Sequence, residues 1–161
     1  MTGVQTCALP IFAILFIFSG QFLLSSGLVT GHPPEIKITT LTGNPAMQNL
    51  KQGPALIYFW AEWCGVCRTM QSNVSAVLPD YPGLTVAVRS GNQQQITTYL
   101  QQQQLKWPVV NDSDGAISQN YGTRSVPALF FLNKQGQIVF TSIGYTSEWG
   151  LRFRLWLAGL L

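Results

Sequence analysis

An apolar run that ends in two closely spaced cysteines constrains this chain most. A buried strand is predicted for residues 56–60, and Trp-Cys-Gly-Val-Cys follows at residues 63–67. At the start of a helix, this spacing lets Cys64 and Cys67 close a small disulfide. It also places the first sulfur at the helix N-terminus, where free N–H groups and the helix dipole stabilise a thiolate. Because the thiolate is the nucleophile in disulfide exchange, we predict that Cys64 attacks and Cys67 resolves.

A metal site is the alternative interpretation of the two cysteines. A structural zinc ion needs four ligands, usually completed by a second Cys or His pair. The chain has three cysteines and one histidine, so a complete zinc site would need ligands from another chain. Two thiolates also suit Cu(I), although His32 lies in a predicted linker. We expect no cofactor besides the disulfide and no resident metal, and a copper-binding or metallochaperone module stays open as an alternative.

The front of the chain is apolar, with no charged side chain before Glu35. Residues 9–29 could form a membrane-spanning helix, because about 20 helical residues cover about 30 Å. We predict an uncleaved anchor; a secretory signal, with small residues at 25–27 as the cleavage region, is the alternative. The anchor places the rest of the chain in the bacterial periplasm, tethered to the inner membrane, and a cleaved signal leaves it soluble there.

Residues 1–11 read like the translation of a common sequencing adapter. We interpret them as an assembly artefact, which explains why the basic residues expected before a signal or anchor are missing. Cys7 then has no function, and the native N-terminus is not given by this sequence.

Length and charge suggest one domain, at residues 36–161, after a linker at residues 30–35. The net charge is only +3, and the basic residues are scattered, which gives no nucleic-acid-binding stripe. Phosphate-binding and dinucleotide-binding glycine motifs are absent from the sequence. We therefore expect no nucleic-acid partner.

The apolar periodicity predicts an α/β order of elements. An edge strand is expected at residues 36–41, and one helix should run from Cys64 through Val77. A strand, a helix and a second strand should fill residues 84–110, followed by a short helix at 117–121 and a hairpin at 128–140. A terminal helix at 148–160 should bury Leu151, Leu155 and Ala158. We also expect a second apolar stripe on this helix to pack in the core rather than face a membrane: Trp149, Phe153, Trp156 and Leu160.

Residues 54–67 resemble the active-site strand and helix of the thioredoxin superfamily, and Val126-Pro127 resembles its cis-proline loop. The resemblance implies a central mixed β-sheet flanked by helices, with a cis bond before Pro127. It also implies a docking groove for partner proteins lined by Trp63, Val126 and Pro127. Packing against the helix is the alternative role for Trp63.

Residues 84–110 resemble the strand-helix insertion of exported TlpA/DsbE-type proteins, which also add an N-terminal strand. Residues 86–91 and 144–156 are similar to the suppressor-for-copper-sensitivity D (ScsD) group of membrane-anchored protein disulfide oxidoreductases. This implies exchange with exported protein thiols and disulfides, electron supply from a DsbD/ScsB-type membrane protein, and a role in copper tolerance. A reductant for cytochrome c maturation and a binding module with idle cysteines remain alternatives.

Three positions differ from thioredoxin or could tune the cysteines. Gly65-Val66 replaces Gly-Pro between them, and this dipeptide influences the reduction potential in the superfamily. Tyr58 stands where thioredoxin buries an acidic residue, so the group that helps to deprotonate Cys67 is open. Glu62 is interpreted as a solvated residue at the strand end, with a tuning role as the alternative.

Overall fold

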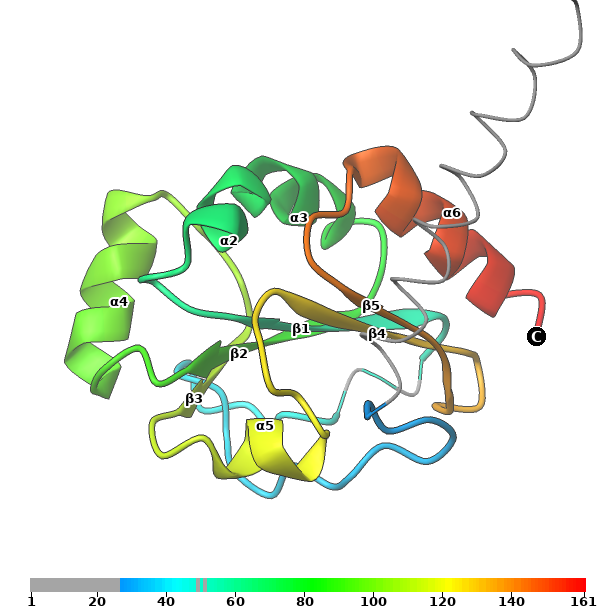
Figure 1. The fold of residues 1–161 in the computed structure, drawn as a ribbon, viewed down its shortest axis with the longest axis horizontal. Helices are drawn as coiled ribbons and strands as arrows, with labels where there is room; N and C mark the ends of the chain where they lie inside the picture. The colour runs from blue at the N-terminus through cyan, green and yellow to red at the C-terminus, as the bar shows by residue number, and fades with distance from the viewer. Residues whose placement is uncertain (1–26, 49, 51) are drawn as a thin grey trace, which may run out of the picture.

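Five strands form one mixed sheet with helices on both faces (Figure 1). The computed structural model describes residues 27–48, 50 and 52–161. The predicted membrane or signal segment therefore lies outside the described residues, apart from residues 27–29. In the described part of the chain, no helix is long and apolar enough to cross a bilayer. The elements are β1 (Ala55–Trp60), α2 (Gly65–Thr69), α3 (Gln71–Val77), β2 (Gly83–Val88), α4 (Gln93–Gln102), β3 (Val109–Asp112), α5 (Ala116–Asn120), β4 (Ala128–Leu132), β5 (Ile138–Ile143) and α6 (Glu148–Ala158).

The cysteine-bearing strand lies at the centre of the sheet. The strand order is β3-β2-β1-β4-β5. β2 runs parallel to both β1 and β3, whereas β4 runs antiparallel to β1 and β5. All six residues of β1 are buried, which explains why this strand is continuously apolar rather than alternating. The architecture matches the predicted mixed sheet flanked by helices.

Each face of the sheet carries its own apolar core, because successive side chains of a strand point to opposite faces. Leu56, Tyr58 and Trp60 of β1 pack on one face with buried side chains of α3, α4 and α6. Ala55, Ile57 and Phe59 pack on the other face, which the α5 region and the N-terminal segment cover (Figure 1). Both cysteines belong to the first core.

The predicted edge strand at residues 36–41, the added N-terminal strand of the resemblance, is wrong. The Thr40 N–H donates to Asn44 O over 2.8 Å, and the Gly43 N–H donates back to Thr40 O. This local turn uses the backbone groups that a strand would pair. Only the Leu41 N–H reaches the sheet edge, at Val109 O.

The segment predicted as a linker lies on the domain. The Gly31 N–H donates to Ile138 O, and the Tyr121 hydroxyl donates to Pro34 O over 2.8 Å. Just before it, the Val29 N–H donates to Tyr121 O. These hydrogen bonds attach the start of the described chain to β5 and to the residue after α5.

The predicted helix at residues 64–77 is only partly correct, whereas the predicted order of elements at residues 84–110 is correct. The helix expected from Cys64 to Val77 is divided into α2 and α3 at Met70. The strand-helix-strand order predicted for residues 84–110 is confirmed by β2, α4 and β3. Asn92 caps α4: its side chain accepts from the Gln95 N–H, and its own N–H donates to the Gln95 side chain, which is the reciprocal capping box.

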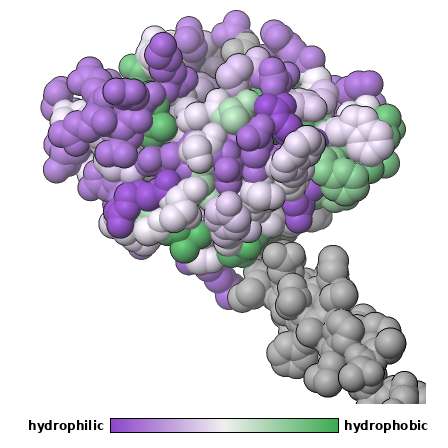
Figure 2. Space-filling view, turned by 90° about the horizontal axis from the view of Figure 1, so that it is seen from above, coloured by the Kyte–Doolittle hydropathy of each residue, from purple (hydrophilic) through white to green (hydrophobic). Residues whose placement is uncertain are grey.

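The core-packing prediction for the second stripe of α6 is also wrong. Leu151, Leu155 and Ala158 are fully buried, as expected. At 100° per residue, Trp149, Phe153 and Trp156 lie on roughly the opposite side of the helix. These side chains are 83%, 58% and 55% exposed, and Leu160 after the helix is 66% exposed. Figure 2 shows apolar side chains gathered at the surface at the α6 end of the molecule.

Candidate functional site

The two cysteines lie where β1 gives way to α2, and they form a disulfide. Cys64 is the N-cap of α2, and its Sγ accepts from the Cys67 N–H over 3.1 Å. Cys64 is 7% exposed and Cys67 only 2%, so the first cysteine is the more accessible one. A thiolate at Cys64 would keep this N–H donor, because an N-cap acceptor binds the free N–H groups of the first turn.

A proline loop packs against the first sulfur. The peptide bond between Val126 and Pro127 is cis, and Val126 O lies 3.6 Å from Cys64 Sγ. In the disulfide this sulfur carries no proton, so the approach is a contact; the reduced thiol could donate to the same oxygen. Pro127 O accepts from the Gly144 N–H over 2.9 Å, which fixes the loop to the end of β5.

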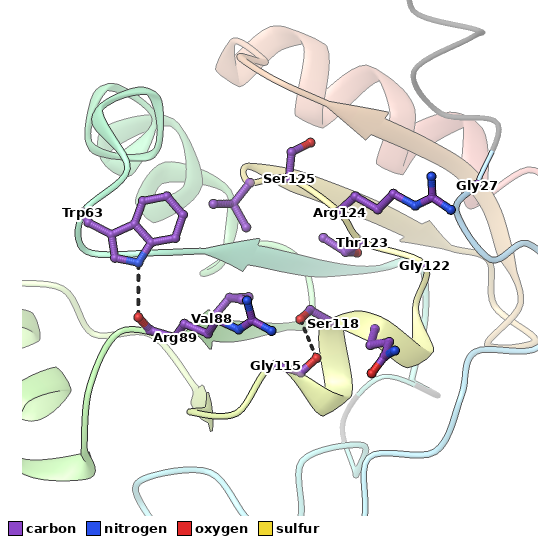
Figure 3. Close-up of a pocket in the computed structure, with 12 residues that line it drawn as sticks. Gly27, Trp63, Val88, Arg89, Gly115, Ser118, Gly122, Thr123, Arg124 and Ser125 are labelled. Carbon is purple, nitrogen blue, oxygen red and sulfur yellow. Dashed lines mark hydrogen bonds between the residues drawn. The ribbon is translucent and has the colours of Figure 1, made fainter.

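Trp63 lies on the surface beside Cys64. Its side chain is 60% exposed, and its Nε1–H donates to Arg89 O over 3.1 Å. The alternative role of packing against the helix therefore does not describe this side chain. The indole joins the loop after β1 to the loop after β2 through this hydrogen bond (Figure 3). The rest of the ring is an apolar surface on the residue directly before Cys64.

The hydrogen bonds of Glu62 are formed by its main chain. Its N–H donates to Ser90 Oγ over 3.1 Å, and its carbonyl oxygen accepts from Arg68 Nη1. Ser90 is 1% exposed and also donates to Val88 O. Ser90 therefore ties the segment before Cys64 to the end of β2. Among the described residues, the Glu62 carboxylate forms no ion pair.

The dipeptide between the cysteines is open to solvent. Gly65 and Val66 are exposed in the first turn of α2, and Val66 is 45% exposed. The Thr69 hydroxyl donates to Val66 O over 2.8 Å. The effect of Gly65 and Val66 on the reduction potential remains a prediction.

Tyr58 fills the position that would hold a buried acid. It is fully buried, and its ring meets Trp107 edge-on at 5.9 Å. Burial, with a smaller contribution from Tyr99, raises the pKa of Tyr58 well above its ordinary value. Its hydroxyl has no hydrogen-bond partner in the described part of the chain. Tyr58 is thus a neutral phenol and supplies no negative charge behind Cys67.

The described residues contain no group of three or more His, Cys, Asp or Glu side chains that could hold a metal ion. The redox-active group of this site is the disulfide itself.

Arg89, Ser90 and Arg124 also lie around the site, although their sequence pattern did not predict it. The predicted order of strands could have indicated Arg89 and Ser90. Because β1 and β2 are parallel neighbours, their carboxyl ends meet at one edge, so residues after β2 lie beside residues after β1. Arg124 precedes the proline loop closely in sequence, but which way it faces depends on the fold.

Comparisons with known proteins agree with this geometry. A family model described as the AhpC/TSA family matches residues 30–141. The chain is 33% identical to a thioredoxin-like protein of Haemophilus influenzae, over 77% of this chain and 75% of that protein. It is 25% identical to sporulation thiol-disulfide oxidoreductase A of Bacillus subtilis, over 70% and 72%. A solved secreted disulfide oxidoreductase of Mycobacterium tuberculosis has a TM-score of 0.65 and 26% identity, covering 76% of this chain and 96% of that one. The predicted thioredoxin-like fold is thereby confirmed.

Proposed function

The chain belongs to the AhpC/TSA family, and we propose that it is an exported oxidoreductase that exchanges disulfides with proteins through Cys64 and Cys67. The observation that carries the proposal is the disulfide of these two cysteines at the first turn of α2, against the loop that holds Pro127. Relatives named as thiol-disulfide oxidoreductases support it. The disulfide is the redox group, and no external cofactor is needed.

Two exchange steps move two electrons. The Cys64 thiolate attacks one sulfur of a partner's disulfide, which forms a mixed disulfide and releases the other partner sulfur as a thiolate. The Cys67 thiolate then attacks Cys64 Sγ, closes the Cys64–Cys67 disulfide and releases the second partner sulfur. Both released sulfurs take up the protons that the two cysteines lost. The reverse sequence oxidises a dithiol partner.

The partner would dock across Trp63, Val126 and Pro127. Within the described chain, the main-chain N–H groups of Ser125 and Val126 donate no hydrogen bond. An extended partner segment could pair with them, because unpaired backbone groups support strand addition with little side-chain specificity. The exposed ring of Trp63 would supply apolar contact area beside the reacting sulfurs.

Export is supported by the names of relatives, which include a soluble secreted antigen and a secreted disulfide oxidoreductase of mycobacteria. The apolar residues 9–29 would tether the chain to the bacterial inner membrane with its domain in the periplasm; a cleaved signal is the alternative. In that compartment a DsbD/ScsB-type membrane protein would reduce the chain, and exported proteins would be its substrates.

The physiological role is proposed from the resemblance of residues 144–156 to the ScsD group, which suggests protection of exported thiols during copper stress. A reductant for cytochrome c maturation is the alternative within the same chemistry, because the partner decides the pathway. A Cu(I)-binding module is the alternative outside it.

The first test traps the reaction intermediate. In a full-length Cys7→Ser background, Cys67→Ser should accumulate a mixed disulfide with partner proteins, because the resolving thiol is missing. The matched variant Cys64→Ser should trap far less, since Cys67 is almost fully buried. Non-reducing electrophoresis of acid-quenched samples measures both. Equal trapping by the two variants would contradict the assignment of Cys64 as the attacking cysteine.

The second test measures the reduction potential of the Cys64–Cys67 pair in glutathione buffers. A value near about −120 mV would mark a donor of disulfides, and one near about −270 mV a reductant that needs an electron supply. Failure to form the intramolecular disulfide would contradict the oxidoreductase proposal and favour metal binding.

A further inference from the structure

A groove of about 580 Å³ opens beside the disulfide. Its walls come from the loop after β2, from α5 and from the loop that leads to β4 (Figure 3). Trp63 and Val126 both line it, and Val126 O is in contact with Cys64 Sγ. A partner segment whose cysteine reacts with Cys64 can therefore continue into this groove.

Two arginines line the groove away from Trp63. Arg89 comes from the loop after β2 and Arg124 from the loop before β4, and Figure 3 shows both side chains extending away from the indole. Both residues are exposed. Neither forms an ion pair with a described residue. All six Asp and Glu residues of the sequence belong to the described part of the chain, so no acidic side chain is left to pair with them.

Asp112 and Asp114 contact Arg89 through their main-chain oxygens, and their carboxylates accept from other residues. The Asp112 carboxylate is buried and accepts from the N–H groups of Ile117 and Ser118. The Asp114 carboxylate accepts from the Ala116 N–H. The groove thus has two positive charges without a paired negative one, which favours an occupant that carries negative charge.

Arg89 is held in place at the groove wall. Its φ of 45° is a left-handed backbone conformation that non-glycine residues rarely adopt. Its N–H donates to Asp112 O over 2.9 Å, and its Nε–H donates to Asp114 O over 3.4 Å. Gly115 leaves room for the guanidinium, because a Cβ there would lie 2.8 Å from Arg89 Nε. In the described structure, the terminal N–H groups of Arg89 form no hydrogen bond and could bind a carboxylate.

We propose that the groove binds the partner segment next to the reactive cysteine, and that Arg89 and Arg124 select segments that carry Asp or Glu there. This inference rests on the proposed exchange with protein substrates. The occupant is an extended acidic peptide segment, because Val126 of the groove contacts Cys64 Sγ and the two cations lie on separate loops, with side chains that extend away from the indole of Trp63.

The test compares disulfide-linked peptide homodimers as oxidants of the reduced Cys7→Ser chain. Three peptides carry one cysteine flanked by Glu and Asp, by Gln and Asn, or by Lys. In each reaction the chain gains the Cys64–Cys67 disulfide, and the peptide dimer becomes two thiols. Each rate is divided by the rate of the same peptide dimer with dithiothreitol, which removes the effect of the flanking charges on the peptide's own reactivity.

We expect the acidic peptide to react about three- to tenfold faster than the neutral one at low ionic strength, and the ratio to approach one at high salt. Arg89→Gln with Arg124→Gln should bring the ratio close to one, and Arg124→Gln alone should lower it by part of that amount. The matched control is Lys134→Gln, an exposed cation in the turn after β4, which should keep the wild-type ratio.

Equal rates for all three peptides, or an acidic preference that survives the double substitution, would overturn the inference. Oxidised glutathione is tested in the same way. If its exchange rate depends on the two arginines as the rate of the acidic peptide does, the groove binds a small anionic disulfide and the peptide assignment is overturned. Absence of exchange with every peptide would instead contradict the proposed function. Denaturant unfolding of each variant checks that the fold is intact, and the single variant keeps the test decisive if the double one is unfolded.

Discussion

The two apolar faces of α6 predict different costs for two adjacent substitutions. Leu155 is fully buried, whereas Trp156 is 55% exposed. Leu155→Ala removes three buried carbons, worth about 2.4 kcal/mol at about 0.8 kcal/mol per methylene. The residual cavity raises the total toward the usual range of about 2–5 kcal/mol, so we expect a loss of about 3 kcal/mol in the free energy of unfolding. Trp156→Ala should cost only about 1–2 kcal/mol, because roughly half of the ring is already in water and Ala has the higher helix propensity.

Both values are measured by denaturant unfolding of the oxidised chain. Because each kcal/mol lowers the Tm of a chain of this length by about 3 °C, Leu155→Ala should also lower it by about 10 °C. A loss with Trp156→Ala as large as with Leu155→Ala would refute the assignment of the buried and exposed faces. A loss below about 1 kcal/mol with Leu155→Ala would refute it as well.

Three further predictions concern single buried groups. Ser90→Ala removes the oxygen that accepts from the Glu62 N–H. It should lower the free energy of unfolding, measured in urea, by about 1–2 kcal/mol. A loss smaller than about 0.3 kcal/mol would contradict this role of Ser90. Asp112→Asn removes the charge on the carboxylate that accepts from Ile117 and Ser118 and should cost about 1–3 kcal/mol, with faster amide exchange in α5; unchanged exchange there would argue against the role. Burial raises the pKa of Tyr58 and of Tyr121 above the ordinary value of 10.0, so the folded chain keeps two protons that the unfolded chain loses above that pH. The free energy of unfolding should therefore be level below about pH 9 and fall as the pH rises above about 10. Urea unfolding at about pH 8 and about pH 11 measures this fall, and Tyr58→Phe should make it smaller. An unchanged fall in the variant would mean that Tyr58 ionises freely in the folded chain.

The predictions that succeeded rest on interactions between neighbours in the sequence. The position of the cysteine pair at a strand-to-helix junction follows from an apolar run and a spacing of three residues. The hairpin of β4 and β5 follows from two apolar segments around Asn133 and Gly136, a turn that brings them together. Residue type and spacing are enough in these cases, because the partners of each backbone group lie only a few residues away.

The two failed predictions have different causes: a competing local turn at residues 36–41, and packing between distant segments at the terminal helix. Residues 36–41 are apolar enough for a strand, but their own turn takes the hydrogen bonds, and the sheet offers only Val109 O. The terminal helix carries two apolar stripes on opposite sides, and its periodicity alone does not say which one faces the sheet. Arg152 helps to fix that choice: it forms ion pairs with Asp80 and Glu148 and donates to Ala76 O.

The sequence by itself determined the chemistry of this protein, because two cysteines at the start of a helix already define a dithiol that can cycle with its disulfide. It also determined the central strand and the order of most elements, through local apolar patterns. Only the tertiary structure decided the surroundings of that dithiol. Arg89 and Arg124 reach one groove because parallel pairing of β1 with β2, and antiparallel pairing of β1 with β4, bring their loops to the same edge of the sheet. Such convergence depends on long-range strand pairing, which one-dimensional spacing does not encode.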